Sequence, residues 1–141
     1  MELFNFIAET YTYEGRLNRM PYILMTIGFW ILIAINTLFY ISSISFVDSH
    51  EFNIGGILIL VFIFADMVII LFITVFIFFQ TIRRLHDMNQ SGWLCLIKLL
   101  YIIPFLNIVA ILFDIILFIF DGTVGPNQYG EDPKGRIPEF D

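Results

Sequence analysis

Long apolar segments constrain this chain more than any other feature of its sequence. They cover residues 22–45, 55–79 and 93–120. A helix needs about 20 consecutive apolar residues to cross the hydrocarbon core of a bilayer, and these segments exceed that length. Only 14% of the residues are charged and 59% are hydrophobic, whereas a soluble domain carries about 25% charged residues. The sequence therefore predicts a single, all-α integral membrane domain over residues 1–141.

The composition argues against several classes of partner and site. The net charge is −6, and nucleic-acid binding needs a basic face. The single cysteine, Cys95, rules out an internal disulfide and a cysteine-rich metal site. Residues 1–15 contain no Lys or Arg, and the first apolar segment is longer than the core of a signal peptide, so we expect no cleavage. The expected partners are membrane lipids, a second copy of the chain or another membrane protein.

Arginines mark one side of the predicted spans. They occur before the first span and in residues 80–92, which we predict to be a cytoplasmic loop, and they are Arg16, Arg19, Arg83 and Arg84. Residues 46–53, between the first two spans, contain no Lys or Arg. Cytoplasmic loops are enriched in these residues, so the count predicts a multi-pass protein with a cytoplasmic N-terminus. In the N-terminal segment, residues 1–21, helical spacing of four apolar residues predicts a short interfacial helix. They are Leu3, Phe4, Ile7 and Tyr11.

The third apolar segment, residues 93–120, is interrupted by Pro104. As one straight helix it would measure roughly 42 Å, against a hydrocarbon core of about 30 Å. If the chain instead turns just after the proline, Lys98 and Asp114 lie about 8–9 Å deep and can form an ion pair. We therefore favour a broken, re-entrant hairpin over one tilted span. The hairpin puts the irregular tail, residues 121–141, on the side of the arginines, whereas the single span puts it on the other side.

Two polar side chains, Asn36 and Asp66, lie near the middle of the first two predicted spans. Both are about 20 Å from the inner ends of their helices, so they can meet across an antiparallel pair. A carboxylate at this depth costs about 2.5–3.5 kcal/mol and usually faces a partner or a water-filled cavity. One interpretation is a protonated Asp66 that is hydrogen-bonded to Asn36. The other is a proton or cation relay.

Three motifs occur in order along the chain. They are Gly15-Arg16-Leu17-Asn18-Arg19; Arg83-Arg84-Leu85-His86-Asp87 with Ser91-Gly92-Trp93; and Gly122-Thr123-x-Gly125-x-Asn127-x-Tyr129-Gly130-x-Asp132-Pro133. With these motifs and the turn Ile103-Pro104-Phe105-Leu106-Asn107, the chain resembles domain-of-unknown-function family 805, the YhaH/YhaI-like small bacterial inner-membrane proteins. The resemblance covers nearly the whole chain. It implies the bacterial cytoplasmic membrane and no established activity, and neither Asp66 nor Asn36 belongs to the pattern.

The second motif is the densest run of charge between the apolar segments. Its arginines can pair with Asp87 or with the tail carboxylates Asp121 and Asp132, because a planar guanidinium holds a carboxylate through two hydrogen bonds. Asparagine and tyrosine side chains of the tail can add further hydrogen bonds. We therefore expect a cytoplasmic polar knot, meaning a cluster of mutually bonded polar side chains from these segments. Its candidate members are Arg16, Arg19, Arg83, Arg84, His86, Asp87, Asn127, Tyr129 and Asp132.

The same residues allow a second interpretation, an anion site. The tail glycines Gly122, Gly125 and Gly130 permit positive φ, which lets backbone N–H groups converge on one anion. Together with the arginines they would grip a lipid phosphate or another anion. The two interpretations are compatible, and the sequence does not separate them.

Catalysis and metal binding have little support in the sequence. His86 beside Asp87 suggests a general base, but no nucleophile motif accompanies it, and adjacent residues on a helix do not face each other. The other histidine, His50, is expected across the membrane, so we expect no metal site and no cofactor. The predicted function is non-enzymatic, as an interaction, accessory or lipid-contacting protein. The alternative is an oligomeric channel or transporter for a small ion or solute. Its intramembrane polar groups would be Asn36, Asp66, Lys98 and Asp114.

Overall fold

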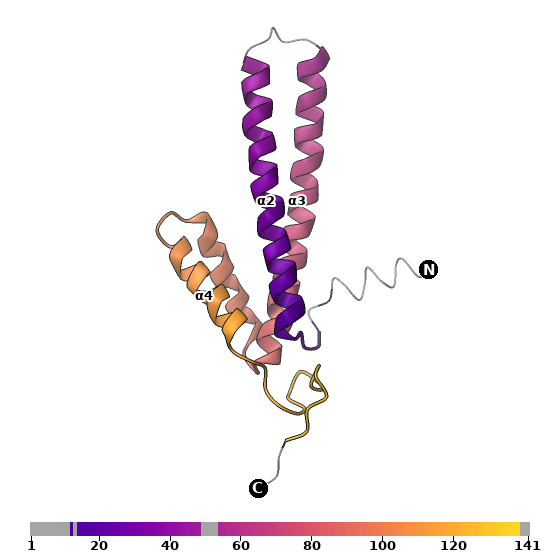
Figure 1. Cartoon of the computed structure of the whole chain (residues 1–141), viewed down its shortest axis with the longest axis vertical. Coiled ribbons are helices and arrows are strands. Elements are labelled where there is room, and N and C mark those ends of the chain that lie inside the picture. The colour runs from indigo at the N-terminus through magenta and orange to yellow at the C-terminus, as the bar shows by residue number, and fades with distance from the viewer. Residues whose placement is uncertain (1–11, 13, 49–53, 139–141) are drawn as a thin grey trace, which may run out of the picture. The chain divides into compact units, whose positions relative to one another are not determined.

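A computed structural model gives the structure of residue 12, residues 14–48 and residues 54–138. Four helices form within these residues (Figure 1). In chain order they are α2 (Arg19–Asp48), α3 (Ile54–Asp87), the 3₁₀ helix η1 (Gly92–Ile102) and α4 (Asn107–Ile119). The described residues contain no β-strand, only an isolated bridge in the tail. The prediction of an all-helical chain with two long apolar helices is therefore confirmed.

Two predicted elements rest mainly on residues outside the described ranges. The interfacial helix was predicted from residues 1–14, of which only Thr12 and Glu14 are described. The loop between the first two spans, residues 46–53, is described only as far as Asp48. Both elements stay predictions.

The described residues form two compact units. One is Thr26–Val75, which we call the helical pair because it consists of the adjoining parts of α2 and α3. The other consists of the described residues of Met1–Met25 and Phe76–Asp141. We call it the motif unit, because it holds all three sequence motifs.

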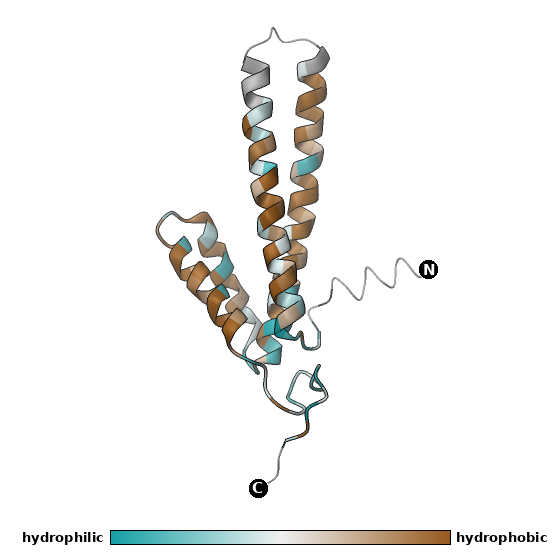
Figure 2. Cartoon of the chain, in the orientation of Figure 1, coloured by the Kyte–Doolittle hydropathy of each residue, from teal (hydrophilic) through white to brown (hydrophobic). Residues whose placement is uncertain are grey.

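Two antiparallel, almost wholly apolar helical segments form the helical pair (Figures 1 and 2). Large apolar side chains such as Leu38 and Phe64 are 68% and 69% exposed. Water would disfavour such a surface, whereas lipid is as apolar as the side chains themselves. The stretches Arg19–Ser43 and Gly56–Asp87 are each long and apolar enough to cross a membrane.

Helix α3 continues through the charged motif, which corrects the predicted loop over residues 80–92. Gln, Leu and Arg are good helix formers, so nothing in the motif stops the helix. It ends where Asn89 adopts the left-handed conformation, with φ of 56°. The N–H of Gln90 donates to the carbonyl of Leu85 at 2.9 Å, and that of Asn89 donates to the carbonyl of His86 at 3.0 Å. This pair of hydrogen bonds is the Schellman arrangement that closes helix C-termini.

The third apolar segment forms a helical hairpin, not one long helix. Helices η1 and α4 pack against each other, and the chain reverses between them at residues 103–106 (Figure 1). Pro104 has no N–H to continue a helix, and Phe105 adopts a left-handed conformation with φ of 68°. The N–H of Asn107 then donates to the carbonyl of Ile103 at 3.1 Å, which closes the turn. One straight helix over residues 93–120 is therefore wrong, and the re-entrant placement of the hairpin in the membrane stays a prediction.

A small apolar core holds the motif unit together. It joins the segment before α2, the first turns of α2, the end of α3 and the hairpin, through Leu17, Tyr22, Leu85, Cys95, Phe113 and Leu117. The tail that follows α4 is irregular through residue 138, as expected. Its turns use Gly125 and Gly135, with φ of 76° and 62°, a conformation that glycine adopts without steric cost. The tail packs back on the end of α3, and this contact forms the candidate site.

Candidate functional site

Asp87, the last residue of α3, lies at the centre of the candidate site. Arg84 donates from Nη1 to Asp87 Oδ2 at 2.5 Å, one helical turn away. Arg16 approaches the other carboxylate oxygen, with Nε 3.1 Å and Nη2 3.0 Å from Oδ1. The three side chains are 0%, 1% and 3% exposed for Arg84, Arg16 and Asp87. Two guanidinium groups therefore share one carboxylate, away from water.

The tail surrounds Arg16 with backbone carbonyl groups. Nη1 of Arg16 donates to the carbonyl of Gly125 at 2.6 Å, and Nη2 donates to that of Thr123 at 2.5 Å. A third carbonyl, that of Gly130, lies 3.4 Å from Nη1. Carbonyl groups accept hydrogen bonds, so this part of the tail binds the guanidinium cation of Arg16. The predicted convergence of N–H groups on an anion is absent around Arg16.

Arg84 also caps helix α4. Its Nε donates to the carbonyl of Leu117 at 3.0 Å, and its Nη2 donates to the carbonyl of Phe120. A guanidinium at a helix C-terminus satisfies carbonyls that have no partner in the helix and interacts favourably with the helix dipole. We had expected the motif arginines to pair with Asp87 or with tail carboxylates. Arg84 pairs with Asp87, and its remaining donors bind carbonyls.

The tail docks on the last turn of α3 through short polar contacts. The backbone N–H and the hydroxyl of Thr123 donate to the carbonyl of Asp87 at 2.9 and 3.2 Å. Asn127 donates from Nδ2 to the carbonyl of His86 at 2.9 Å. Gly122 has no positive φ, contrary to expectation. It is needed for space, because an added Cβ would lie 2.0 Å from Asp87 Oδ2.

His86 has different partners from its neighbour Asp87. Its Nδ1 lies 3.3 Å from the carbonyl oxygen of Gly15. The imidazole stacks on the ring of Tyr129, with centroids 3.8 Å apart and planes at 4°. Tyr129 was predicted to add a hydrogen bond, and it contributes a ring contact instead. His86 and Asp87 do not form an acid–base pair.

Asp132 joins the network from the tail. It accepts from Arg136 Nε at 2.8 Å and from the N–H groups of Lys134 and Gly125 at 2.9 and 3.3 Å. Arg16 Nη2 lies 3.9 Å from it. Mainly through the Arg136 hydrogen bond, the pKa of Asp132 is lowered to about 2. The carboxylate is therefore charged throughout the physiological range.

Asp121 forms an exposed ion-pair cluster beside this network. It accepts from Lys134 Nζ at 2.7 Å and lies 3.4 Å from Arg136 Nη1. The hydrogen bond from Lys134 lowers the pKa of Asp121. The sequence predicts that Asp121 and Asp132 can meet the motif arginines. In the structure both carboxylates form ion pairs with basic residues of the tail itself.

Arg19 and Arg83 take little part in the network. Both are half-buried. Arg83 Nη1 lies 3.4 Å from Gln80 Oε1, and its buried Nε has no hydrogen-bond partner. Among the described residues neither arginine forms an ion pair. Two of the four predicted arginines therefore belong to the polar knot, and two do not.

The hairpin carries a second buried polar group. Lys98 Nζ lies 2.8 Å from Asp114 Oδ1, and both side chains are 6% exposed. The hydroxyls of Tyr22 and Tyr101 donate to Asp114 at 3.0 and 2.7 Å. The ion pair that the hairpin interpretation required is present. The two tyrosines were not predicted, because only the tertiary structure brings them to the carboxylate.

The helical pair carries a third polar contact. Asn36 donates from Nδ2 to Asp66 Oδ2 at 2.7 Å, as the matched depths predicted. Tyr40 donates to the carbonyl of Ile63 at 3.3 Å nearby. The sequence of Thr26–Val75 contains no Lys or Arg. The partner of this carboxylate is therefore an amide and not a cation.

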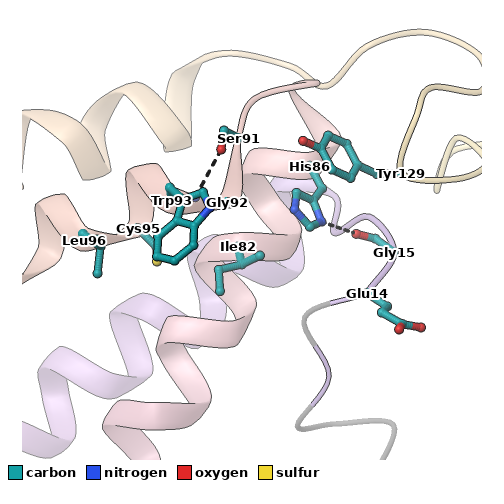
Figure 3. A pocket seen from close by; sticks show the side chains of 10 residues that line it. All are labelled: Glu14, Gly15, Ile82, His86, Ser91, Gly92, Trp93, Cys95, Leu96 and Tyr129. Atoms are coloured by element: carbon teal, nitrogen blue, oxygen red, sulfur yellow. Dashed lines mark hydrogen bonds between the residues drawn. The ribbon is translucent and has the colours of Figure 1, made fainter.

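An apolar pocket opens beside His86 and Tyr129 (Figure 3). Its volume is about 900 Å³, within the range of about 300–1,000 Å³ typical of small-molecule sites. Its walls come from α3, the start of η1, the segment before α2 and the tail. Among the described residues no three side chains of His, Cys, Asp or Glu gather where they could hold a metal ion.

The fold is that of a small helical membrane protein. Most of the polar side chains near the end of α3 are bonded to one another. The chain belongs to the DUF805 family, whose model, "Protein of unknown function (DUF805)", matches residues 10–131. It is similar to "Inner membrane protein YhaI" of Escherichia coli strain K12 and of Escherichia coli O157:H7, each 44% identical over 54 residues. The match covers 38% of this chain and 40% of each relative. No solved structure matches the chain.

Proposed function

We propose that this is a multi-pass protein of the bacterial inner membrane with a cytoplasmic N-terminus. It acts by contact with lipids, as an accessory protein, and not by catalysis. The observation that carries the proposal is the division of the arginines. Arg16 and Arg84 are buried and ion-paired with Asp87, whereas Arg19 and Arg83 are half-buried and have no carboxylate partner among the residues that the structure describes. Unpaired arginines beside apolar helices suit the phosphate groups of a lipid surface.

The dimensions of the hairpin support a re-entrant element. Helix α4 has 13 residues and η1 has 11, which correspond to about 20 Å and 22 Å. The hydrocarbon core is about 30 Å thick, so the hairpin enters the bilayer and returns on the same side. Its tip is apolar and exposed, with Phe105 91% exposed. Lys98 and Asp114 neutralise each other inside it.

The polar knot supports a cytoplasmic location for both ends of the described chain. It joins the segment before α2, the end of α3 and the tail, all within the motif unit. Since Arg16, Arg19, Arg83 and Arg84 belong to this unit, the positive-inside rule assigns it to the cytoplasm.

The bonding of His86 and Asp87 supports a non-catalytic role. Asp87 is held by two arginines, and Nδ1 of His86 faces a backbone carbonyl. Both carboxylate oxygens of Asp87 are therefore occupied by arginine donors. We therefore assign the motif to structure.

The test measures binding of anionic phospholipid vesicles to the purified protein. In the double variant Arg19→Gln/Arg83→Gln we expect about a fivefold loss of affinity per arginine, because each is worth about 1 kcal/mol near an anionic surface. Lys134→Gln removes a cation that is already paired with Asp121 and serves as the matched control. Equal affinity of the double variant and wild type would contradict the proposal.

The second candidate is an oligomeric channel or transporter. It is favoured by the carboxylate of Asp66, which is bonded to an amide in a helical pair whose sequence contains no Lys or Arg. Ion flux into proteoliposomes distinguishes the two: wild type would conduct and Asp66→Asn would not. Absence of flux in both removes this candidate.

A further inference from the structure

We propose that the pocket beside His86 binds the headgroup of a phospholipid that carries a primary ammonium group. The lipid chains would follow the apolar start of η1. The inference builds on the proposed lipid contact and adds a specific site and a lipid class. It uses neither Arg19 nor Arg83.

The pocket has polar lining residues and an apolar wall. The polar residues include Glu14, His86 and Ser91, and the ring of Tyr129 covers one face of the imidazole (Figure 3). The apolar wall consists of Ile82, Trp93, Cys95 and Leu96. Trp93 is 78% exposed, so this wall continues onto the outer surface of η1. A ligand that fits must itself have a polar head and an apolar body.

The imidazole of His86 presents an acceptor to the pocket. Nδ1 lies 3.3 Å from the carbonyl oxygen of Gly15, which can only accept. Nδ1 therefore carries the hydrogen, and Nε2 of the neutral ring carries the lone pair. Nε2 has no hydrogen-bond partner among the described residues, although the residue is only 8% exposed. An acceptor without a donor, on a side chain of a residue this buried, favours a ligand that supplies an N–H group.

Gly92 keeps this acceptor accessible. A Cβ added there would lie 3.1 Å from His86 Nε2 and 2.9 Å from Ile82 Cγ2. A side chain at this position would therefore fill the space in front of the ring nitrogen. The absence of a side chain at the first residue of η1 leaves room for a ligand atom.

The charge of the pocket selects the headgroup. Its ten lining residues include one carboxylate, that of Glu14, and no Lys or Arg. A primary ammonium supplies both the positive charge and the N–H donors that Nε2 needs. A trimethylammonium group has the charge but no donor, and a glycerol headgroup brings a phosphate without a compensating cation. Phosphatidylethanolamine-type lipids therefore fit better than choline or glycerol lipids.

The test uses tryptophan quenching by brominated phospholipids. The chain has two tryptophans, so Trp30→Phe leaves Trp93, in the pocket wall, as the single reporter. Vesicles of phosphatidylcholine would contain graded amounts of dibrominated phosphatidylethanolamine, phosphatidylcholine or phosphatidylglycerol. We expect Trp93 to prefer the ethanolamine lipid about threefold over the choline lipid, as for one exposed ion pair with its hydrogen bond. Trp93→Phe leaves Trp30, outside the motif unit, which should show no preference.

Three variants in the Trp30→Phe background complete the test. Glu14→Gln should reduce the preference to near unity, and Gly92→Ala should abolish it by blocking Nε2. Glu131→Gln removes an exposed tail carboxylate that does not line the pocket, and should keep the preference. Quenching of both tryptophans without headgroup preference overturns the pocket proposal and leaves the lipid contact intact. Absence of quenching at both overturns the lipid contact itself. A preference for phosphatidylglycerol, or an unchanged preference in Glu14→Gln, also overturns the pocket proposal.

Discussion

At the scale of single residues, Asp87 connects parts of the chain that are far apart in sequence. It bonds to Arg84 one turn before it and to Arg16, 71 positions earlier. Its own carbonyl accepts from Thr123, 36 positions later. The remaining N–H groups of the two arginines donate to backbone carbonyls at the end of α4 and in the tail. One carboxylate thus sets how three segments of the motif unit meet.

Replacing Asp87 with Ala tests this role. Two buried guanidinium groups would lose their shared counter-charge, and loss of one partner from a buried ion pair costs about 3–5 kcal/mol. We expect a clear drop in the thermal unfolding midpoint in detergent, measured by intrinsic fluorescence. Glu131→Ala, at an exposed carboxylate, should leave the midpoint unchanged. Similar midpoints for both variants would show that Asp87 is not central.

Replacing Gly122 with Ala tests the close approach of the tail. The added Cβ would lie 2.0 Å from Asp87 Oδ2, so the tail must move away from α3. We expect cleavage of the tail by a protease at a concentration that leaves the wild type intact. Gly28→Ala is the matched control, because nothing lies within 4 Å of its added Cβ. It should be neutral or stabilising, by up to about 1 kcal/mol. Equal resistance of Gly122→Ala and wild type would argue against the contact.

At the scale of elements, the hairpin and the tail are each held by ionic contacts of a different kind. The Lys98–Asp114 pair lies inside the hairpin and is reinforced by two tyrosine hydroxyls. The ion pairs of the tail lie nearer the surface, and those of Asp121 are largely exposed. The hairpin is therefore sensitive to loss of one charge, and the tail is sensitive to pH.

Replacing Lys98 with Met should destabilise the hairpin, because Asp114 is left as an uncompensated buried carboxylate. Adding Asp114→Asn to Lys98→Met removes that charge and should recover part of the loss, since the amide oxygen still accepts from one of the two tyrosine hydroxyls that bind Asp114. The thermal midpoints of both single variants and the double variant give the coupling energy. Additive effects of the two substitutions would show that the pair is not coupled.

Acid should release the tail. The pKa of Asp132 falls from an ordinary value of 3.8 to about 2, so its stabilising effect is fully present above about pH 4. It is lost as the pH falls from about 4 to about 2. The pKa of Asp121 is also lowered, so its stabilising effect is likewise lost on acidification. Hydrogen exchange at the amides of Gly125 and Lys134, corrected for intrinsic rates, should rise over this window. Asp132→Asn should show faster exchange already at pH 7. Exchange that stays constant from pH 5 to pH 2 would contradict this assignment.

At the scale of the whole molecule, the units have different surfaces. The helical pair is apolar around Asn36 and Asp66, whereas the motif unit combines an apolar hairpin with a polar knot (Figure 2). This division fits a protein that is anchored in lipid and presents one polar face to water. The sidedness of that face is the main prediction at this scale.

Thiol labelling of intact cells tests the sidedness. In a Cys95→Ser background, Thr12→Cys and Glu131→Cys should react with an impermeant reagent only after the inner membrane is opened. Ser49→Cys, in the sequence between the two long helices, should react before that. Because the proposed re-entrant hairpin returns the chain to its starting side, Thr12→Cys and Glu131→Cys should behave alike. Labelling of Glu131→Cys from the outside would refute the re-entrant hairpin and the cytoplasmic tail together.

The sequence alone determined the helical class, the two long apolar helices, the break at Pro104 and two polar pairs, Asn36–Asp66 and Lys98–Asp114. These follow from local composition and from helical rise, since one residue advances a helix by about 1.5 Å wherever the helix sits. Depth along a helix can therefore be read from residue numbers, and partners at equal depth can be paired.

Only the tertiary structure decided the bonding of the motifs. Arg16 and Arg84 form ion pairs with Asp87, and carbonyl groups of the tail, not N–H groups, surround Arg16. Both arrangements depend on how an irregular segment folds back on the end of α3. The φ and ψ angles of such a segment follow no repeat, so residue spacing carries no distance information. The same reason hid the role of Thr123 and the pocket beside His86, whose walls come from four separate parts of the chain. The roles of Tyr22 and Tyr101 depend on how their helices pack against α4.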